Sequence, residues 1–542
     1  MGISKRRAIG SLMAAASIVF LGVLTAGIVA GQSNTWVRQF GTSFTDKAAA
    51  VSVDQSGYIY IAGHTAGRLM DQTRIGGDSD AYVLKVDSLG NPVWARQFGS
   101  VGADIAWSVA VGAGGDLFLA GQMAQAPPNR AAVSGFATAF LRKFSSDGTE
   151  LWARQFGAPG RAWATGVAVD PAGNSYVVGQ TEEALPGQTS FGSKDAFIRS
   201  YDPNGNERWT RQFGAGGGDF AAAVAADGLG NIFVAGSSGG EITLIGQGHQ
   251  VTIRPFVRKY RPDGTLVWER RPHIFGFARF LAAAVDSQGG LYVAGWVSGS
   301  LSGQTQAGGT DAFVTKINGE GNDIWTHQFG TPKEDRALGI AVDETGASYA
   351  VGWTRGLFPG QIGLGEGSLL ERRDAFIHKM DSQGNGLWTR QVGTPLAQLA
   401  NGVVTDGAGS LYVVGETRGP LLGQASQGTV DAFLLKLDAG PAGDTVEVQA
   451  TAMPTIAESG AVSTVPPTKS NPTNLPPITP ISSPTIAPVP EVPGTSACSA
   501  PQLGGGPVQL AWFLVTMIPA ALAAAGGRSR HGRGSTLDEE LP

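Results

Sequence analysis

Cysteine is nearly absent from this sequence of 542 residues. The only one, Cys498, cannot pair within one chain, which excludes a disulfide framework and a cysteine metal site. Charged residues are also scarce, at 15% of the chain, against about 25% in an average soluble protein. The formal net charge of −5 is too mild to suggest nucleic acid or an acidic substrate as a partner. Packing and hydrogen bonding must therefore hold the fold together.

Common signatures of catalytic and cofactor sites are missing too. The sequence has no glycine-rich phosphate loop, no G-x-S-x-G nucleophile elbow and no H-E-x-x-H helix. The histidines show no spacing typical of metal ligands: His64, His249 and His273 fall in different repeats, and His327 replaces the arginine of a repeated motif. We therefore assign no catalytic residue and no cofactor.

The first 30 residues have the pattern of an export signal. Lys5, Arg6 and Arg7 precede an apolar run from Ala8 to Ala30, and this order is typical of a secretory signal peptide. The run also approaches the roughly 20 residues that span a bilayer, so an uncleaved N-terminal anchor is the alternative. Both interpretations predict an extracytoplasmic protein, with Ala30 as the candidate processing position.

The composition changes at residue 439. Residues 439–506 are rich in Pro, Thr and Ser, which predicts a disordered, extended stalk. Residues 507–525 are apolar, and the tail at 526–542 is first basic and then acidic, which favours a transmembrane helix or a bacterial C-terminal sorting signal. Cys498 is either a processing or lipid-attachment site or a thiol without such a role. We therefore expect anchoring at a bacterial cell surface.

One stretch of six residues, WARQFG, occurs at residues 94–99 and again at 152–157. Looser copies of this stretch begin at Trp36, Trp209, Trp268, Trp325 and Trp388. Three other pieces of strand length recur with it: an apolar run ending in Asp, a segment such as YIYIAG ending in Gly, and a segment such as DAYVLKVD. The unit of about 58 residues thus contains four short strands with glycine in its turns.

Seven such units over residues 34–438 predict an all-β fold, the seven-bladed β-propeller. A four-stranded antiparallel blade cannot bury both faces alone, and a closed ring gives each blade two neighbours. An open solenoid is the alternative. The patterns D-x-x-G-x-x-Y-V-x-G and D-A-F-V-x-K also resemble the bacterial SBBP family, named for its seven-bladed β-propeller repeats. This resemblance implies the fold but no single activity. The fourth unit departs most from the pattern, because it has RPF from Arg254 where other units have DAF.

The two ends of the repeat region predict how the ring closes. In propellers of similar repeats, the apolar run ending in Asp is innermost and the tryptophan strand is outermost. The segment at Trp36 then precedes any inner strand, whereas the last unit lacks an outer strand. We predict that residues 36–41 complete the blade of residues 400–438, with closure by residues 444–450 as the alternative. We expect this ring to be monomeric.

Residues that every blade repeats are explained by the blade itself. We therefore interpret Trp94, Phe98, Gly63, Asp54 and Phe197 as structural. A recurring L-x-G-Q element opens most long connections, and because it is shared we expect it to order them. Its copies begin at Leu185, Leu301, Phe358 and Leu421.

Residues that vary between blades are better candidates for binding a ligand. The turns after the first and third strands are short, which places the long connections, such as 64–79, 237–253 and 353–373, on one face. The residue after the glycine of each second strand lies on this face and varies. These residues are His64, Gln122, Gln180, Ser237, Trp296, Trp353 and Glu416.

Two further tryptophans, Trp107 and Trp163, lie at the start of inner strands. Exposed tryptophans would suit stacking on a sugar or a peptide side chain, and packing beneath a loop is the alternative.

Four aspartates also recur before inner strands, and they are the candidate metal ligands. An aspartate in a loop commonly accepts hydrogen bonds from nearby backbone amides instead. The four are Asp46, Asp104, Asp219 and Asp335.

These features favour an exported, non-enzymatic binding or adhesion module. The stalk would hold it away from the membrane, and the face with long loops would bind a glycan or a protein. An extracellular hydrolase or lyase at the axial mouth, using Asp46, Asp104 and Asp335, is the alternative, because a fold does not determine function.

Overall fold

The computed structural model describes residues 35–124, 137–157, 160–245, 248–272, 276–361 and 373–440. All regular elements in these ranges are strands, and they form seven antiparallel sheets of four strands. Among these residues no helix is long and apolar enough for a membrane span. The expected signal segment with Ala30, the apolar segment at 507–525, Cys498 and nearly all of the stalk lie outside the described residues.

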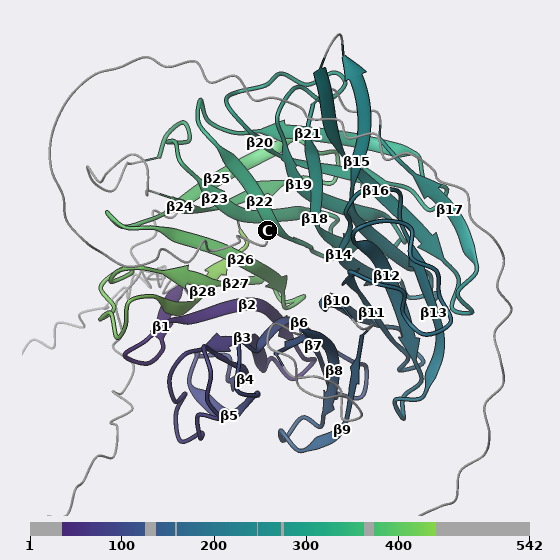
Figure 1. Cartoon of the computed structure of the whole chain (residues 1–542). Helices are drawn as coiled ribbons and strands as arrows, with labels where there is room; N and C mark the ends of the chain where they lie inside the picture. The colour runs from purple at the N-terminus through teal and green to yellow at the C-terminus, as the bar shows by residue number, and fades with distance from the viewer. Residues whose placement is uncertain are drawn as a thin grey trace, which may run out of the picture. The chain divides into compact units, whose positions relative to one another are not determined.

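Six blades each consist of four consecutive strands (Figure 1). Blade 1 contains β2 (Asp46–Val53), β3 (Ile59–Thr65), β4 (Asp80–Val86) and β5 (Pro92–Phe98). Blade 2 contains β6 (Ile105–Val111), β7 (Leu117–Met123), β8 (Thr138–Phe144) and β9 (Glu150–Phe156). Blade 3 contains β10 (Ala162–Val169), β11 (Ser175–Thr181), β12 (Asp195–Tyr201) and β13 (Glu207–Phe213).

The other blades follow the same order along the chain. Blade 4 contains β14 (Asp219–Ala226), β15 (Ile232–Ile245), β16 (Gly248–Tyr260) and β17 (Leu266–Arg270). Blade 5 contains β18 (Ala278–Val285), β19 (Leu291–Val297), β20 (Asp311–Ile317) and β21 (Asp323–Phe329). Blade 6 contains β22 (Asp335–Val342), β23 (Ser348–Thr354), β24 (Asp374–Met380) and β25 (Gly386–Val392).

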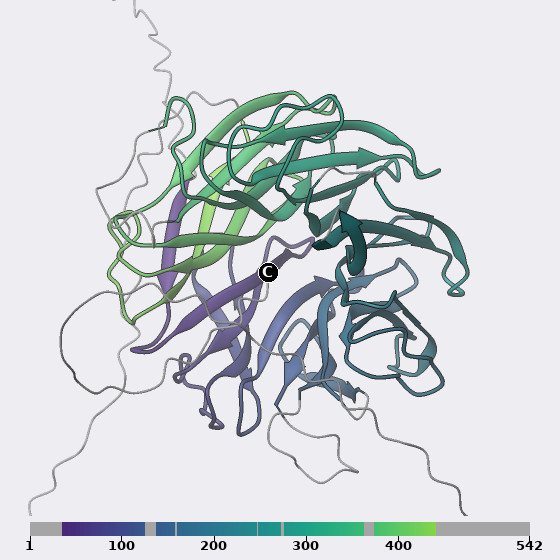
Figure 2. The same cartoon turned by 45° about the horizontal axis from the view of Figure 1, so that its top comes forward.

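Blade 7 joins the two ends of the repeat region. It contains β26 (Gln398–Thr405), β27 (Ser410–Thr417), β28 (Asp431–Asp438) and, as its outer strand, β1 (Trp36–Phe40). Trp36 pairs with Lys436 and Phe40 with Ala432, and Figure 2 shows β1, in purple, beside the green strands of the last blade. The predicted closure is thus confirmed. Residues 444–450, the alternative, lie outside the described residues.

The first strands of neighbouring blades contact one another around the axis, which places them innermost as predicted. The hydrophobic core lies between adjacent blades. Tyr60 and Val83 of blade 1, for example, pack with Leu117 and Phe140 of blade 2 in one buried cluster. A blade therefore buries its faces only because the ring supplies neighbours on both sides.

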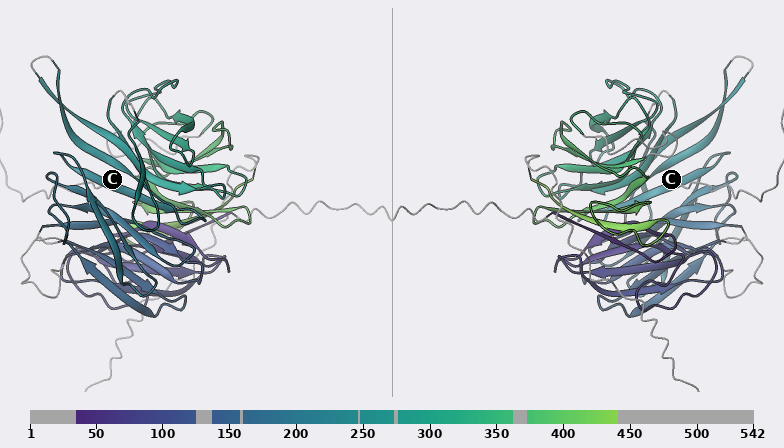
Figure 3. Two further views of the ribbon diagram at one scale, coloured as in Figure 1. Left: turned by 90° about the vertical axis from the view of Figure 1, so that its right-hand side faces the viewer. Right: turned by 90° about the vertical axis from the view of Figure 1, so that its left-hand side faces the viewer.

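The long connections meet on one face, as predicted. A parallel bridge between Ser79 and Ala103 joins the connection after β3 to the one before β6. The prediction of a loop at 237–253 is wrong, because β15 and β16 extend through most of this segment as a hairpin that projects from the ring (Figure 3). Pairing runs from Ile232 and Tyr260 to Ile245 and Gly248, with one register shift between Gly239 and Glu241, and it gives these backbone groups partners in the extended ladder.

Candidate functional site

A ring of paired positions surrounds the end of the inner strands on the long-loop face, which we call the mouth. Each variable residue after a second-strand glycine pairs directly with a residue of the inner strand, so both side chains lie on the same face of their sheet. The pairs are Lys47/His64, Ile105/Gln122, Trp163/Gln180, Phe220/Ser237, Arg279/Trp296, Arg336/Trp353 and Leu399/Glu416.

Side chains from blades 7, 1 and 2 form one group at the mouth. Lys47 Nζ lies 3.2 Å from Glu416 Oε2, an ion pair between blades 1 and 7. The His64 ring lies edge-on to Trp107, with 6.4 Å between ring centroids, and the Trp107 indole donates to Gln122 Oε1 at 3.4 Å. Burial, together with the charge of Lys47, lowers the pKa of His64 to about 3, so this imidazole is neutral at physiological pH.

A second group, from blades 5 and 6, combines arginines with tryptophans. The Cζ atom of Arg336 lies 4.8 Å from the ring centroid of Trp296 and 5.1 Å from that of Trp353. Arg373 and Arg355 approach Trp353 as well, at 4.6 and 5.8 Å. Each guanidinium lies within the distance at which a cation is attracted to an aromatic face. We call Arg279, Trp296, Arg336 and Trp353 the Arg-Trp sector.

The tryptophans differ in accessibility, which corrects the expectation that they are exposed. Trp163 and Trp353 are only 8% and 4% exposed, and cations cover their rings: Lys194 lies over Trp163 at 5.3 Å. They pack within the mouth, as the alternative interpretation held. Trp107 and Trp296 are half-buried and so retain surface for a ligand.

The four candidate aspartates are buried and bind the backbone. Asp46 Oδ2 accepts the amide of Thr42 at 2.6 Å, and Asp219 and Asp335 accept the equivalent amides. Asp104 also accepts two backbone amides, from Ser100 and Ala124. Among the described residues, no group of three or more His, Cys, Asp or Glu side chains could hold a metal ion. The interpretation as loop-ordering residues therefore accounts for their geometry.

Each of these aspartates also lies near a second aspartate, the first residue of the third strand in the preceding blade. At the Cβ position of Gly99, for instance, Asp104 Oδ2 is 2.7 Å away and Asp80 Oδ1 is 2.8 Å away. Burial raises the pKa of Asp335 to about 6, and the charge of Asp311 adds to this effect. Burial also raises the pKa values of Asp46, Asp104 and Asp219. Because these side chains are at most 2% exposed, they do not reach a substrate at the mouth as a general acid or base must.

The L-x-G-Q element orders the long connections, as expected. In blade 3, the amide of Leu185 donates to Gln212 Oε1 at 2.8 Å, and the amide of Gln212 donates to Gln188 Oε1 at 3.1 Å. The glutamine of the repeated QFG thus fastens the first and last residues of the element. Equivalent bonds to the leading residue occur at Leu301, Phe358 and Leu421.

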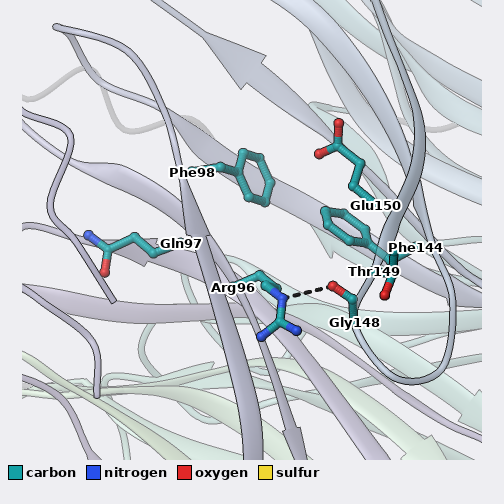
Figure 4. Close-up of a pocket in the computed structure, with 7 residues that line it drawn as sticks. All are labelled: Arg96, Gln97, Phe98, Phe144, Gly148, Thr149 and Glu150. Carbon is teal, nitrogen blue, oxygen red and sulfur yellow. Dashed lines mark hydrogen bonds between the residues drawn. The ribbon is translucent and has the colours of Figure 1, made fainter. Parts of the chain in front are cut away.

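A pocket on the outer side of the ring has a different origin (Figure 4). It lies between blades 1 and 2, where Arg96 Nε donates to the carbonyl of Gly148 at 2.7 Å. Its lining includes Phe98, Phe144 and Glu150. Arg96 and Phe98 belong to the repeated WARQFG, and Arg154 makes the same bond to Gly205. The pocket is therefore a by-product of the repeated joint between blades.

Sequence reasoning missed the cationic inner-strand members of the mouth. Lys47, Arg279 and Arg336 are the register partners of His64, Trp296 and Trp353. A signal was available, because the inner-strand position varies among the repeats as much as its partner does. Ser237 faces Phe220 across β14 and β15 and is 4% exposed.

Four segments match the SBBP family of beta-propeller repeats, at residues 35–69, 151–184, 208–242 and 387–421. The matches begin on the tryptophan strand and run through the second strand of the next blade. The chain is thus a seven-bladed β-propeller that contains repeats of the SBBP type. The residues interpreted as structural have such roles: Asp54, within the first matched segment, accepts the hydroxyl of Tyr60 at 2.8 Å, and Phe197 is fully buried.

Among known proteins, this SBBP-type propeller is similar to the regulatory protein FlaEY of Caulobacter vibrioides, at 26% identity over 441 residues. The match covers 72% of this chain and 43% of FlaEY, so the chain spans less than half the length of that relative. Phage phi92 endosialidase has a TM-score of 0.41 at 11% identity, covering 79% of this chain and 74% of its own. Polysaccharide lyase Uly1 has a TM-score of 0.39 at 11% identity, covering 77% and 94%. These structural likenesses concern the fold alone.

Proposed function

We propose that this propeller is an exported binding module that is held at the bacterial cell surface and binds a glycan or a protein at its mouth. One observation carries the proposal: the side chains that differ between blades gather on the face with long loops, on a scaffold that the repeats make rigid. Loops and strand ends on such a scaffold are the usual position of binding residues. The half-buried Trp107 and Trp296 supply aromatic surface there.

The ends of the chain support the cell-surface part of this proposal through their sequence. The apolar segments at 8–30 and 507–525 would target and anchor the chain, and the residues between 439 and 506 would serve as a spacer. Cell fractionation of the wild type and of variants at Ala30 and Cys498 tests this part. A protein recovered only from the cytoplasm would contradict it.

The binding role can be tested on the purified full-length chain with a glycan array and a pulldown of surface proteins. We design a mouth variant in which His64, Trp107, Trp296 and Glu416 are all replaced by Ser, a side chain that blade 4 carries naturally at Ser237. This variant should lose at least 90% of the captured ligand.

A matched control changes the opposite face, where the short turns lie. Leu89 and Leu229 are 62% and 87% exposed in such turns, and replacing both by Ser should leave capture unchanged. Two blank assays with the wild type, or equal losses in the two variants, would contradict the proposal.

A further inference from the structure

Cations are unevenly distributed among the inner-strand positions of the mouth. Three of these seven equivalent positions are cationic. Lys47 has its counter-charge, Glu416, at 3.2 Å on the neighbouring blade. The other two, Arg279 and Arg336, lie on adjacent blades and form the cationic side of the Arg-Trp sector. The seven residues are Lys47, Ile105, Trp163, Phe220, Arg279, Arg336 and Leu399.

Among the described residues, no carboxylate serves as a counter-charge for Arg279. Its Nε is buried and has no hydrogen-bond partner, and none of the described carboxylates forms an ion pair with it. Burial lowers its pKa, with no charged neighbour contributing. A guanidinium nevertheless stays protonated in proteins. A partly buried charge without a partner is unfavourable, and an anionic ligand would relieve this cost.

Trp296 adds an aromatic surface beside this charge. It pairs directly with Arg279 across β18 and β19, so the two side chains emerge next to each other on one face. Among the described residues, Arg336 is the cation over this ring, with its Cζ atom 4.8 Å from the Trp296 centroid. The planar fork of Arg279 therefore remains available for a ligand, and Trp296 is held in place by a second cation.

We propose that the Arg-Trp sector binds a uronate unit of an acidic polysaccharide. The inference rests on the binding role proposed above and names its ligand class. The carboxylate accepts two hydrogen bonds from the guanidinium of Arg279, a geometry that the planar fork matches. The sugar ring lies beside Trp296, because aromatic side chains pack well against the apolar face of a pyranose. A uronate joins a carboxylate directly to a ring, whereas an acidic peptide offers a carboxylate on a flexible side chain.

Calorimetric titration of the full-length chain tests this inference with tetramers of galacturonate and of mannuronate. The methyl esters of the same tetramers keep the rings and remove the charge, and hexaglutamate supplies the charge without the rings. At least one acidic tetramer should bind about ten to a hundred times more tightly than its ester, the range expected for a charge-assisted pair. Hexaglutamate should bind more weakly than that tetramer.

Two single substitutions place the effect on the mouth. Arg279→Gln keeps an amide donor and removes the charge, and it should weaken binding of the acidic tetramer about ten to a hundredfold while leaving the ester unaffected. Arg208→Gln removes an exposed cation from β13, the outer strand of blade 3 and away from the mouth, and its effect should stay within about twofold. The comparison of acid with ester on the wild type does not depend on how well either variant folds.

The inference is overturned if neither tetramer binds better than its ester, if hexaglutamate binds as tightly, or if Arg279→Gln leaves the affinity unchanged. In these cases the binding role still stands when the array or the pulldown finds a ligand that the Ser-substituted mouth variant loses. When those assays are blank as well, both proposals fail.

Discussion

The indole of Trp94 in blade 1 lies directly against Gly148 in the neighbouring blade 2. A Cβ at Gly148 would come within 3.0 Å of Trp94 Cδ2, and the indole N–H donates to the carbonyl of Ser146 in the same turn at 3.2 Å. This joint explains why the tryptophan recurs, since six of its seven copies pack against a turn glycine of the next blade. The equivalent pairs are Trp36–Gly90, Trp152–Gly205, Trp209–Gly264, Trp268–Gly321 and Trp325–Gly384.

Gly148→Ala should destabilise the ring more than a glycine substitution in an equally strained turn. Gly148 has a φ of +84° and Gly57 one of +81°, so an alanine at either position costs about 1 to 2 kcal/mol from the backbone alone. Only the alanine at Gly148 also displaces the indole, which adds about 1 to 3 kcal/mol, because a Cβ at Gly57 meets no atom within 4 Å. Unfolding in urea gives the unfolding free energy of both variants. Equal losses of this free energy would show that contact between Trp94 and Gly148 does not contribute to stability.

Gly99→Ala and Gly157→Ala test the packing of the paired carboxylates. A Cβ at Gly99 would lie 2.7 and 2.8 Å from oxygens of Asp104 and Asp80, whereas the nearest atom to one at Gly157 would be Ala162 Cβ, in ordinary contact at 3.4 Å. We expect Gly99→Ala to cost about 1 to 3 kcal/mol of unfolding free energy.

Gly157→Ala is the matched control, because the same QFG glycine there faces no carboxylate. It should be neutral or stabilise by up to about 1 kcal/mol, since alanine restricts the unfolded chain. Thermal unfolding of both variants gives the comparison. If Gly157→Ala lost as much stability as Gly99→Ala, close packing against the two carboxylates would not explain the cost at Gly99.

The pKa of Asp335, raised to about 6 by burial, predicts a specific pH dependence of stability. The unfolded chain releases this proton near pH 4, at about 3.9, so the folded state binds more protons between that pH and about 6. The resulting stabilisation is fully present below about pH 4 and is lost as the pH rises through 6. Asp335→Asn avoids this loss and should be more stable than the wild type at pH 7 to 8, by at most about 2 to 3 kcal/mol.

Unfolding free energies of Asp335→Asn and the wild type between pH 4 and 8 provide the measurement. Gln398 already shows that an amide can serve at the equivalent position in blade 7, where its Oε1 accepts the amide of Thr394 at 2.8 Å. Asp343→Asn is a control of opposite sign: hydrogen bonds lower the pKa of Asp343, so this variant should be less stable at pH 7, and its deficit should shrink as the pH falls. A difference between Asp335→Asn and wild type that does not change with pH would refute the assignment.

Removal of residues 34–41 should open the ring. The outer strand of blade 7 would be lost and β28 would become an exposed edge, which favours association with other chains. We expect a lower unfolding temperature and oligomers in size-exclusion chromatography. A deletion variant that stays monomeric with an unchanged unfolding temperature would show that another segment closes the ring.

Gln39→Ala probes the same clasp without a deletion. Gln39 is 2% exposed; its Nε2 donates to Asp431 Oδ2 at 2.7 Å, and its Oε1 accepts the amide of Leu421 at 2.9 Å. Leaving these buried groups without partners should cost about 2 to 4 kcal/mol. Gln97→Ala removes the equivalent bonds within blade 1 and should cost a similar amount, because the clasp behaves as an ordinary outer strand. A Gln39→Ala variant with an unchanged free energy of unfolding would contradict this role of Gln39 in ring closure.

Much of the fold could be predicted because it depends on local patterns that recur. Propellers of similar repeats indicate that the strand preceding Asp54 is innermost, and counting strands from there places the strand at Trp36 in the last blade. The loop expected at 237–253 failed because nothing in the repeat indicates how far a hairpin continues beyond its blade. The candidate site was predicted in part. His64, Trp296 and Glu416 were found, but their partners across the sheet were not.

The net charge of the sequence has a similar limit, because it does not give the position of individual charges. A net charge of −5 describes the whole chain, whereas Arg279 and Arg336 meet only because blades 5 and 6 are adjacent and their strands are in register. A sum over the chain has no information on where charges gather. The sequence also left open whether Trp163 and Trp353 are exposed, because the cations that cover them come from other segments.

The sequence by itself determined that this protein is a closed ring of seven four-stranded blades, because each repeat encodes the same turns, strand lengths and buried faces. Only the tertiary structure decided which variable side chains stand together at the mouth, which tryptophans are covered and which arginine has no counter-charge among the described residues. The physical reason is that hydrogen-bonded turns and alternating burial act between near neighbours in the chain. Contacts such as that of Arg336 with Trp296 depend instead on the packing of one blade against the next.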